Sequence, residues 1–267
     1  MTERDIADRY ERDLRSRGAG AAYYGHSDFY NYGYWTPETR SQREASEDLV
    51  GELLKLIPYR TGTILDVACG AGATTRHLLR HYEPEAITGI DISPALLELA
   101  AQNAPGCTLI RMNAADMHGL PDESFENVLC VEAAFHFDTR EDYLREALRV
   151  LKPGGRLVQS DILFDESAAL LVDRLVQVPR RNFVSGPDAY RCMLEDVGFE
   201  EVAVRDATRE CWQGFRDHLA RWRELPRPER PRVRDRMRMH FYTALYARII
   251  AFYVLCSARK PGSAPRP

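Results

Sequence analysis

The sequence predicts an α/β fold, a mostly parallel sheet with helices on both faces. Short apolar runs of strand length alternate with helix-length segments between residues 61 and 164. One run, at residues 63–68, stops at the near-adjacent glycines Gly70 and Gly72, and the next ends in an acid, Asp91. Strands that alternate with helices build a parallel sheet whose two faces are both covered.

The elements follow in order along the chain. The first 60 residues read as mostly helical, with an aromatic loop from Tyr23 to Trp35 and a helix over 48–57 that stops at Pro58. Strands are expected at 63–68, 86–91, 108–112, 127–132 and 156–163, with helices over 73–81, 94–101 and 140–150. Later helices are expected at 168–178, 188–197, 211–224 and 235–249, and strands at 201–206 and 251–258. Seven strands in all are therefore expected.

The domain organisation follows from these elements. Residues 1–60 form a helical lid segment and residues 61–164 a Rossmann-like core that binds the cofactor. Residues 165–260 complete the sheet and carry helical cap insertions, and residues 261–267 form a disordered tail. The cap is expected over the strand ends, where an open α/β sheet binds its substrate.

Composition narrows the class of protein. The chain has 267 residues, 45% of them hydrophobic, and a formal net charge of -4, which gives no reason to expect nucleic acid. None of the six cysteines forms a Cys-x-x-Cys pair, and no His/Asp cluster has metal-ligand spacing, so no metal is expected. No apolar run is long enough for a membrane span and the charged start is not a signal peptide, so we expect a cytoplasmic protein.

The glycine turn and the strand-end acid indicate a site for an adenosine-containing cofactor. Glycines let the backbone approach a ligand, and Asp91 can accept two hydrogen bonds from a ribose diol. A dinucleotide fingerprint needs a glycine where this chain has Thr75. Asp66, just before the turn, would repel a pyrophosphate but suits a ligand with an ammonium and a sulfonium. That ligand is S-adenosylmethionine (SAM).

At these residues the chain resembles the class I SAM-dependent methyltransferases, from about Thr61 to Phe164. The matching segments are Asp-Val-Ala-Cys-Gly-Ala-Gly at 66–72, the strand-end Asp91, Leu-Pro-Asp-Glu-Ser-Phe at 120–125 and Leu-Lys-Pro-Gly-Gly at 151–155. Asn-Tyr-Gly-Tyr-Trp at 31–35 is similar to the lid motif of small-molecule methyltransferases that act on sugars and polyketides. The segment at 251–260 is similar to their last strand.

The cofactor residues are expected at three strand ends and in the lid. Gly70 and Gly72 approach the methionine part, with Asp66 supporting the turn, and Asp91 takes the ribose hydroxyls. Further contacts are expected from Ile92 packing on adenine, Asn113 and Ala114 beside its amine, and Tyr34 and Trp35 of the aromatic lid. The family often has aspartate where this chain has Asn113, and Asp116 is the alternative at that position.

Three residues are candidates for catalysis. Methyl transfer is a direct displacement that needs alignment of the nucleophile, and a hydroxyl nucleophile must also lose its proton. His136, just past the fourth strand, is the first choice as base, and Asp161 in the fifth strand is expected to orient it or bind the acceptor. The resemblance also implies a His and an Asp at these places in sugar O-methyltransferases. Glu132 is a rival base or a ligand of the methionine end, and His136 has the alternative role of a hydrogen-bonded core histidine.

The sequence therefore predicts a methyltransferase of natural-product biosynthesis, acting on a hydroxyl of a small-molecule acceptor. One alternative is C-methylation of a prenyl chain or aromatic carbon, with Glu132 or Asp161 steadying a cation, and another is a non-enzymatic SAM-binding partner protein. The arginine-rich stretch at 221–238 is a solvated linker or a site for an anionic acceptor. No membrane partner is expected, and homo-oligomerisation is left open.

Overall fold

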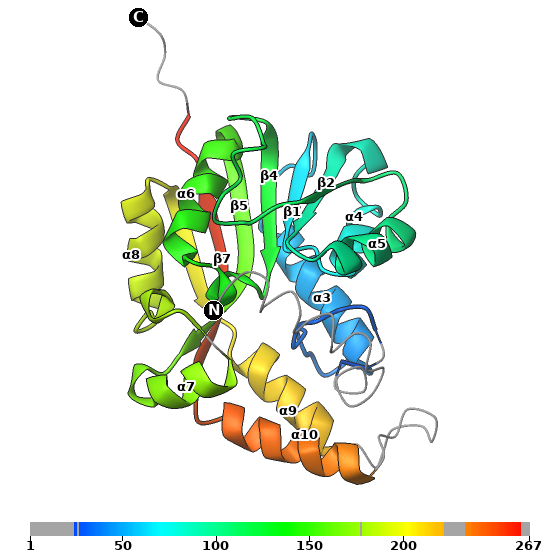
Figure 1. The fold of residues 1–267 in the computed structure, drawn as a ribbon, viewed down its shortest axis with the longest axis vertical. Helices are drawn as coiled ribbons and strands as arrows, with labels where there is room; N and C mark the ends of the chain where they lie inside the picture. The colour runs from blue at the N-terminus through cyan, green and yellow to red at the C-terminus, as the bar shows by residue number, and fades with distance from the viewer. Residues whose placement is uncertain (1–23, 26, 177, 222–232, 263–267) are drawn as a thin grey trace, which may run out of the picture.

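The computed structural model describes residues 24–25, 27–176, 178–221 and 233–262. In this part of the chain seven strands form one sheet, in the order β3-β2-β1-β4-β5-β7-β6 (Figure 1). The strands are β1 (Ile64–Val67), β2 (Ile87–Asp91), β3 (Thr108–Arg111), β4 (Phe125–Val131), β5 (Leu151–Phe164), β6 (Glu200–Asp206) and β7 (Ile250–Arg259). β7 runs antiparallel to both of its neighbours, while the pairs from β3 to β5 are parallel. The predicted fold class is confirmed.

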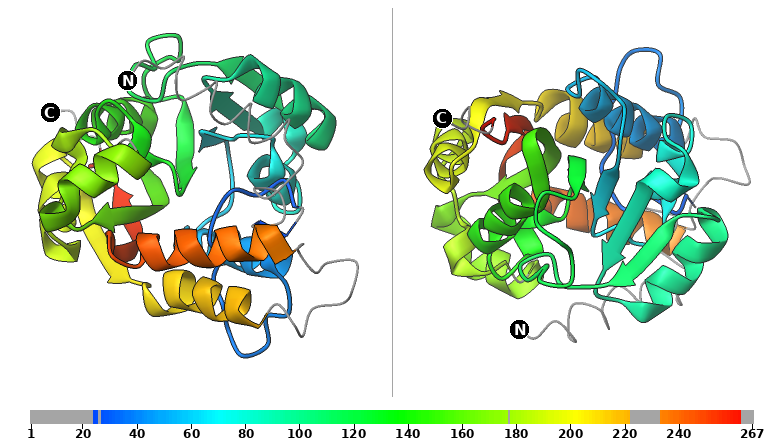
Figure 2. Two further views of the ribbon diagram at one scale, coloured as in Figure 1. Left: turned by 60° about the horizontal axis from the view of Figure 1, so that its bottom comes forward. Right: turned by 90° about the horizontal axis from the view of Figure 1, so that it is seen from above.

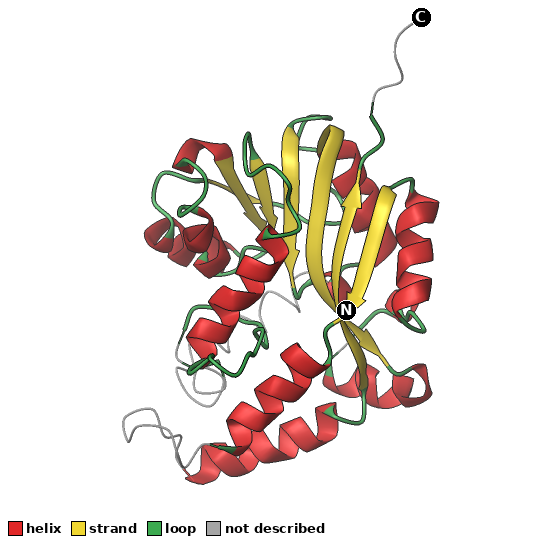
Figure 3. Cartoon of the chain, turned by 180° about the vertical axis from the view of Figure 1, so that it is seen from behind, coloured by secondary structure: helices red, strands yellow, loops and turns green. Residues whose placement is uncertain are grey.

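Helices cover both faces of the sheet, as Figure 3 shows from behind. On one face, α4 (Ala73–Leu78) and α5 (Pro94–Asn103) pack against β2, and α3 (Gln42–Leu54) packs against α4 and β5. α6 (Arg140–Val150) and α8 (Pro187–Val197) pack on each other and cover the other face. Alternate residues of β1 therefore enter different cores. Ile64 packs in the core cluster that contains α3 and α4, and Leu65 packs in the one that contains α6 and α8.

Local signals explain where the helices begin. The Ser93 side chain accepts a hydrogen bond from the Leu96 amide, and Pro94 occupies the first turn of α5, as predicted. α3 begins earlier than the predicted residue 48, because Ser41 caps it by accepting a hydrogen bond from the Glu44 amide. Its polar first turns hid this start from the apolar pattern.

The cap lies at the edge of the sheet where the parallel strands end. α7 (Ala169–Leu175) follows β5, and a π-helical turn η5 (Arg209–Gln213), α9 (Gly214–Ala220) and α10 (Val233–Tyr246) lie between β6 and β7. Figures 1 and 2 show α7, α9 and α10 at this edge, where the described N-terminal segment also lies. The helical structure expected before Tyr24, most of the disordered tail and the middle of the arginine-rich stretch fall outside the described residues.

The N-terminal segment is anchored to the cap by aromatic packing. The ring of Tyr32 lies 4.9 Å from the rings of both Trp212 and Phe215. The Trp35 amide donates to the Glu210 carbonyl at 3.0 Å. These contacts place residues just before α3 beside residues just after β6. Among the described helices, none is both long and apolar enough to cross a membrane.

Candidate active site

The turn after β1 brings backbone to the wall of a cavity. Gly70 lines this cavity with φ +55°, and a Cβ placed on it would meet no atom within 4 Å. Gly72, with φ +80°, has a different task, because a Cβ there would lie 2.7 Å from the Ala100 Cα of α5. The two glycines, both expected at the cofactor, therefore have different roles. Gly70 leaves room for a ligand, and Gly72 permits close packing of α4 and α5.

Asp91 ends β2 beside this turn. Its Oδ2 accepts the Gly70 amide at 3.0 Å and its Oδ1 accepts the Ser93 amide at 2.9 Å, which fixes the carboxyl group on the cavity wall. Burial raises the pKa of this carboxyl, while the backbone hydrogen bonds lower it. Carboxylate oxygens have further lone pairs, so Asp91 can still accept hydroxyl groups from a ligand.

Asp66 is not a cavity-lining residue. It is buried behind the turn, where its Oδ2 accepts the Thr75 hydroxyl at 2.7 Å. Burial raises the pKa of its carboxyl to about 7. Asp66 therefore ties the end of β1 to the first turn of α4 and supports the turn from below.

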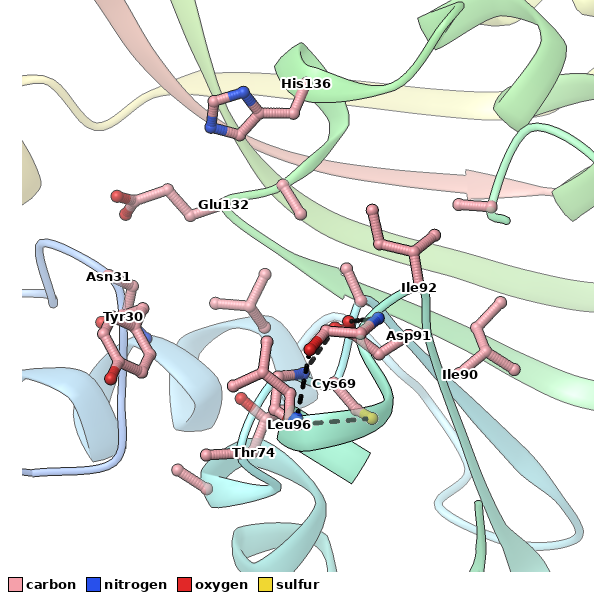
Figure 4. Close-up of a pocket in the computed structure, with 18 of the residues that line it drawn as sticks. Tyr30, Asn31, Cys69, Thr74, Ile90, Asp91, Ile92, Leu96, Glu132 and His136 are labelled. Carbon is pink, nitrogen blue, oxygen red and sulfur yellow. Dashed lines mark hydrogen bonds between the residues drawn. The ribbon is translucent and has the colours of Figure 1, made fainter. Parts of the chain in front are cut away.

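Apolar side chains form the part of the cavity next to Asp91. Ile92 and Leu96, both labelled in Figure 4, line it. Ala114 and Met112 line it as well. Asn113 also lines it, and its Oδ1 accepts the Ala115 amide at 2.8 Å. The alternative residue, Asp116, is exposed and paired with His118. A flat, mostly apolar ring system with polar atoms at its edge, such as adenine, suits this part of the cavity wall.

The end of β4 supplies the opposite part of the cavity. Glu132 and His136 both line it, and Figure 4 shows them on one side with Asp91 across from them. Glu132 has φ +53°, a left-handed conformation that is uncommon for a residue with a side chain. His136 belongs to a short 3-10 turn, η2 (Ala134–His136), and is half-buried.

Hydrogen bonds from distant parts of the chain hold Glu132. Its Oε2 accepts the Tyr32 amide at 2.9 Å and the Tyr253 hydroxyl at 2.8 Å. Burial raises the pKa of the Glu132 carboxyl to about 8; these two bonds oppose the shift and the charge of Asp161 adds to it. A buried acid with this pKa is mostly protonated at neutral pH.

Asp161 does not reach the cavity wall, contrary to the expectation that it faces the methyl group. Its side chain is fully buried under η2, where Oδ2 accepts Arg140 Nε and the Tyr190 hydroxyl, each at 2.7 Å. Oδ1 accepts the amides of Phe135 at 3.2 Å and Ile162 at 2.9 Å. Odd-numbered residues of this part of β5 face α6 and α8, so the carboxyl group is directed away from the cofactor side.

Tyr34 and Trp35 also lie off the cavity wall, although we expected them at the cofactor. The Trp35 ring is buried and stacks on His218 at 4.4 Å, and Tyr34 lies under Arg205, 5.5 Å from the ring centroid. The residues of the N-terminal segment that do line the cavity are earlier, at Asp28–Asn31. The lid motif therefore contains one residue of the cavity wall, Asn31, while Trp35 anchors the segment to the cap and Tyr34 packs against Arg205 of β6.

Several residues of the site gave no clear signal in the sequence. Arg140 and Tyr190 form the buried network around Asp161, and Asn182 joins it by accepting the Arg140 amide at 2.8 Å. Their positions on helices read as ordinary surface or core positions. Tyr253 reads as one more apolar residue of the last strand, although its hydroxyl group contacts Glu132.

The described residues contain no group of three or more His, Cys, Asp or Glu side chains that could hold a metal ion. In the arginine-rich stretch, residues 222–232 lie outside the described part, so the linker and anion-site interpretations stay open there.

The cavity itself fits SAM on structural grounds. Gly70 leaves backbone space, Asp91 offers acceptors for ribose, and Ile92 and Leu96 offer an apolar wall for adenine.

This chain is similar to known proteins in both sequence and fold. Residues 65–159 match the family described as a methyltransferase domain. The chain is 30% identical over 244 residues to the 27-O-demethylrifamycin SV methyltransferase of Amycolatopsis mediterranei, a match that covers 86% of this chain and 89% of that protein. A solved structure of the [4+2]-cyclase SpnF is 23% identical, covers 98% of both chains and has a TM-score of 0.72. A geranyl diphosphate C-methyltransferase from Streptomyces coelicolor, solved with S-adenosylhomocysteine (SAH), is 14% identical, covers 97% of both chains and has a TM-score of 0.70.

The two solved structures share the fold, and the rifamycin relative shares both extent and sequence with this chain. SAM is the cofactor of the methyltransferase family that residues 65–159 of this chain match. The chain thus belongs to the class I SAM-dependent methyltransferases and, among them, to the enzymes that methylate small molecules.

Proposed function

We propose that this enzyme transfers the methyl group of SAM to a hydroxyl oxygen of a natural product, with His136 as the general base. The observation that carries the proposal is the place of His136, which shares one cavity with Gly70 and Asp91 but lies at its opposite side. The name of the rifamycin relative, which refers to an O-demethylated substrate, also supports it.

The order of the strands suggests how the cofactor lies. β3 and β2 carry the apolar wall and Asp91, β1 carries the glycine turn, and β4 carries Glu132 and His136. The cavity would hold SAM with its adenine against Ile92 and Leu96, its ribose at Asp91, and its sulfonium between the glycine turn after β1 and the neighbouring end of β4. When bound, SAM supplies an electrophilic methyl carbon.

The chain's own residues would then align and deprotonate the acceptor. His136 would take the proton of the acceptor hydroxyl as the new C–O bond forms and the C–S bond breaks, and would pass that proton to solvent. The Asp28–Asn31 segment would close the cavity and exclude water. The Glu132 carboxyl group is already engaged by the Tyr32 amide and the Tyr253 hydroxyl, both on Oε2, so His136 is the candidate base.

Asp161 would act as a positioning residue in this scheme. It accepts the amide of Phe135, the residue directly before His136, and pairs with Arg140 at the start of α6. The turn that carries the imidazole is therefore fixed at both ends by a buried ion pair.

C-methylation of a prenyl chain or aromatic carbon is the second candidate. The observation that favours it is the buried carboxyl of Glu132 on the cavity wall, which could stabilise a carbocation after losing its proton. The third interpretation, a non-enzymatic SAM-binding protein, is set aside because the chain belongs to an enzyme family. An anionic acceptor, a homo-oligomer and a cytoplasmic location stay predictions.

The test combines product structure with variants of two histidines. Hydroxylated macrolactones, glycosides and prenylated phenols are incubated with enzyme and SAM, and the position of the new methyl group is assigned by NMR. We expect an O-methyl product, and His136→Gln should lower kcat by about a hundredfold or more with nearly unchanged SAM affinity. The control is His118→Gln, at an exposed position off the cavity.

The pH profile adds a second criterion. If His136 is the base, kcat/KM falls at low pH with an apparent pKa in the histidine range, and this limb disappears in the variant. A C-methyl product, or a fully active His136→Gln enzyme, would refute O-methylation by this mechanism.

A further inference from the structure

Glu132 is the buried acid that links three distant parts of the chain at the cofactor cavity. It ends β4, receives the Tyr32 amide from the N-terminal segment and the Tyr253 hydroxyl from β7, and lines the cavity. A left-handed backbone at Glu132 directs this side chain, and such strain is found at functional sites.

The hydrogen bonds determine which oxygen carries a proton. The N–H of Tyr32 and the O–H of Tyr253 both bond to Oε2, so a proton on the carboxyl group belongs on Oε1. Burial raises the pKa of Tyr253 as well, which keeps that hydroxyl a donor. Before a cofactor binds, Glu132 is thus a neutral acid held by two donors.

A bound cofactor changes the charge beside this acid. In the orientation derived from the strand order, the sulfonium of SAM lies next to the end of β4. SAH has the same adenosine and amino acid groups but a neutral sulfur. We infer that Glu132 distinguishes SAM from SAH by charge, releasing its proton to solvent when SAM binds and taking one back when SAH has replaced it.

The inference rests on the orientation of SAM in the proposed function, and its magnitude follows from simple electrostatics. A cation within about 4–6 Å lowers a carboxyl pKa by about 1 to 3. Because the pKa of Glu132 is about 8 before SAM binds, SAM binding near pH 7 should release about 0.4 to 0.9 proton. SAM affinity should rise about fivefold or more between pH 6 and 8 and level off above about pH 9, because SAM prefers the carboxylate.

Other titratable groups around Glu132 could contribute protons, so the test has to separate them. They are His136 on η2, Asp161 on β5, Cys211 on η5, Tyr253 on β7, and Asp28 and Tyr30 of the N-terminal segment. Asp161 is already paired with a buried arginine, and burial keeps the Cys211 thiol and the Tyr253 hydroxyl protonated by raising their pKa. His136 is the strongest competitor as a proton source.

The experiment is calorimetry of SAM and SAH binding in two buffers of different ionisation enthalpy, at several pH values from 6 to 9. We expect proton release with SAM and little or none with SAH. Glu132→Gln, which mimics the neutral acid, should abolish the release and reduce SAM affinity at pH 8 about fivefold or more, with SAH affinity nearly unchanged. His136→Gln and the exposed control Glu98→Gln should keep the release.

Tyr253→Phe provides a second variant, because it removes one donor to the carboxylate. In this variant, proton release on SAM binding should move to higher pH, since the lost hydrogen bond lowers the pKa of Glu132. Equal release with SAM and SAH, or release that survives in Glu132→Gln but not in His136→Gln, would overturn the inference. Either result leaves the transferase proposal standing, whereas proton-linked SAM binding with no O-methyl product would refute the proposed acceptor and not this role of Glu132.

Discussion

Asp161→Asn tests whether this acid is a structural anchor or a group that contacts reactants. The carboxyl group accepts four hydrogen bonds, two on each oxygen, from Arg140, Tyr190 and the amides of Phe135 and Ile162. An asparagine offers one acceptor and one donor. Whichever way the amide is turned, its NH2 group faces two donors, and Arg140 loses its charge partner.

Loss of one partner of a buried ion pair costs about 3–5 kcal/mol, because the other charge is left uncompensated. A domain has a free energy of unfolding of about 5–15 kcal/mol, so this is a large fraction of it. The urea midpoint of Asp161→Asn should fall by about 1–5 M at a slope of about 1–3 kcal/mol/M. Arg140→Met should be similarly damaging, and the double variant should show a coupling energy of about 1–3 kcal/mol.

Urea unfolding followed by circular dichroism measures these changes, and the exposed Asp196→Asn serves as control. A positioning role also predicts that kcat falls while the low-pH limb assigned to His136 remains visible. If Asp161→Asn has the urea midpoint of wild type but loses both activity and affinity for the acceptor, the anchor role is wrong and Asp161 contacts the acceptor.

Three further predictions follow from the site. Gly70→Ala should weaken SAM binding with a loss of stability of only about 1 kcal/mol, whereas Gly72→Ala, which presses on the α5 backbone, should lose stability first; calorimetry and thermal unfolding separate the two, and equal effects would contradict this division. Asp66 keeps its proton more tightly when folded, because burial raises its pKa from 3.8 to about 7, so its stabilising contribution is lost as pH rises through that range. The stability of Asp66→Asn relative to wild type should therefore increase between pH 4 and 7, and the difference should stay constant above pH 7. Urea midpoints measured across this pH range check this. A stability difference that does not change with pH would exclude it. In hydrogen exchange, amides of Asp28–Asn31 should become more protected on SAM binding while that of Trp35, already bonded to η5, should not change; ligand-independent exchange at both would indicate a fixed segment throughout.

The sequence predicted the elements of the sheet well because each depends on short-range patterns. β2 and α6 lie within a residue of their expected bounds, since an acid or a capping residue marks an end of each. Asp91 and His136 both line the cavity, because parallel strands bring their carboxyl ends to one edge of a sheet.

The roles of Asp161, Tyr34 and Trp35 could not be predicted in the same way. β5 is buried on both faces and carries apolar residues on each, so the sequence does not show which face Asp161 occupies, and its partners lie on two separate helices. The place of Trp35 depends on η5 and α9, which are about 175 residues later in the chain. Long-range packing of this kind leaves no local pattern.

The place of β7 in the sheet has a consequence for how the protein acquires its shape. β7 comes after β6 in the chain but pairs between β5 and β6, so β6 has no neighbour in this sheet until β7 pairs with it. Such late, non-local pairing slows folding and leaves strand edges open to aggregation. Because the Glu132 bond from Tyr253 depends on β7, a folding intermediate without this strand would have secondary structure but an incomplete cofactor cavity. Cofactor added during refolding should therefore bind only in the last phase, after the sheet has been completed.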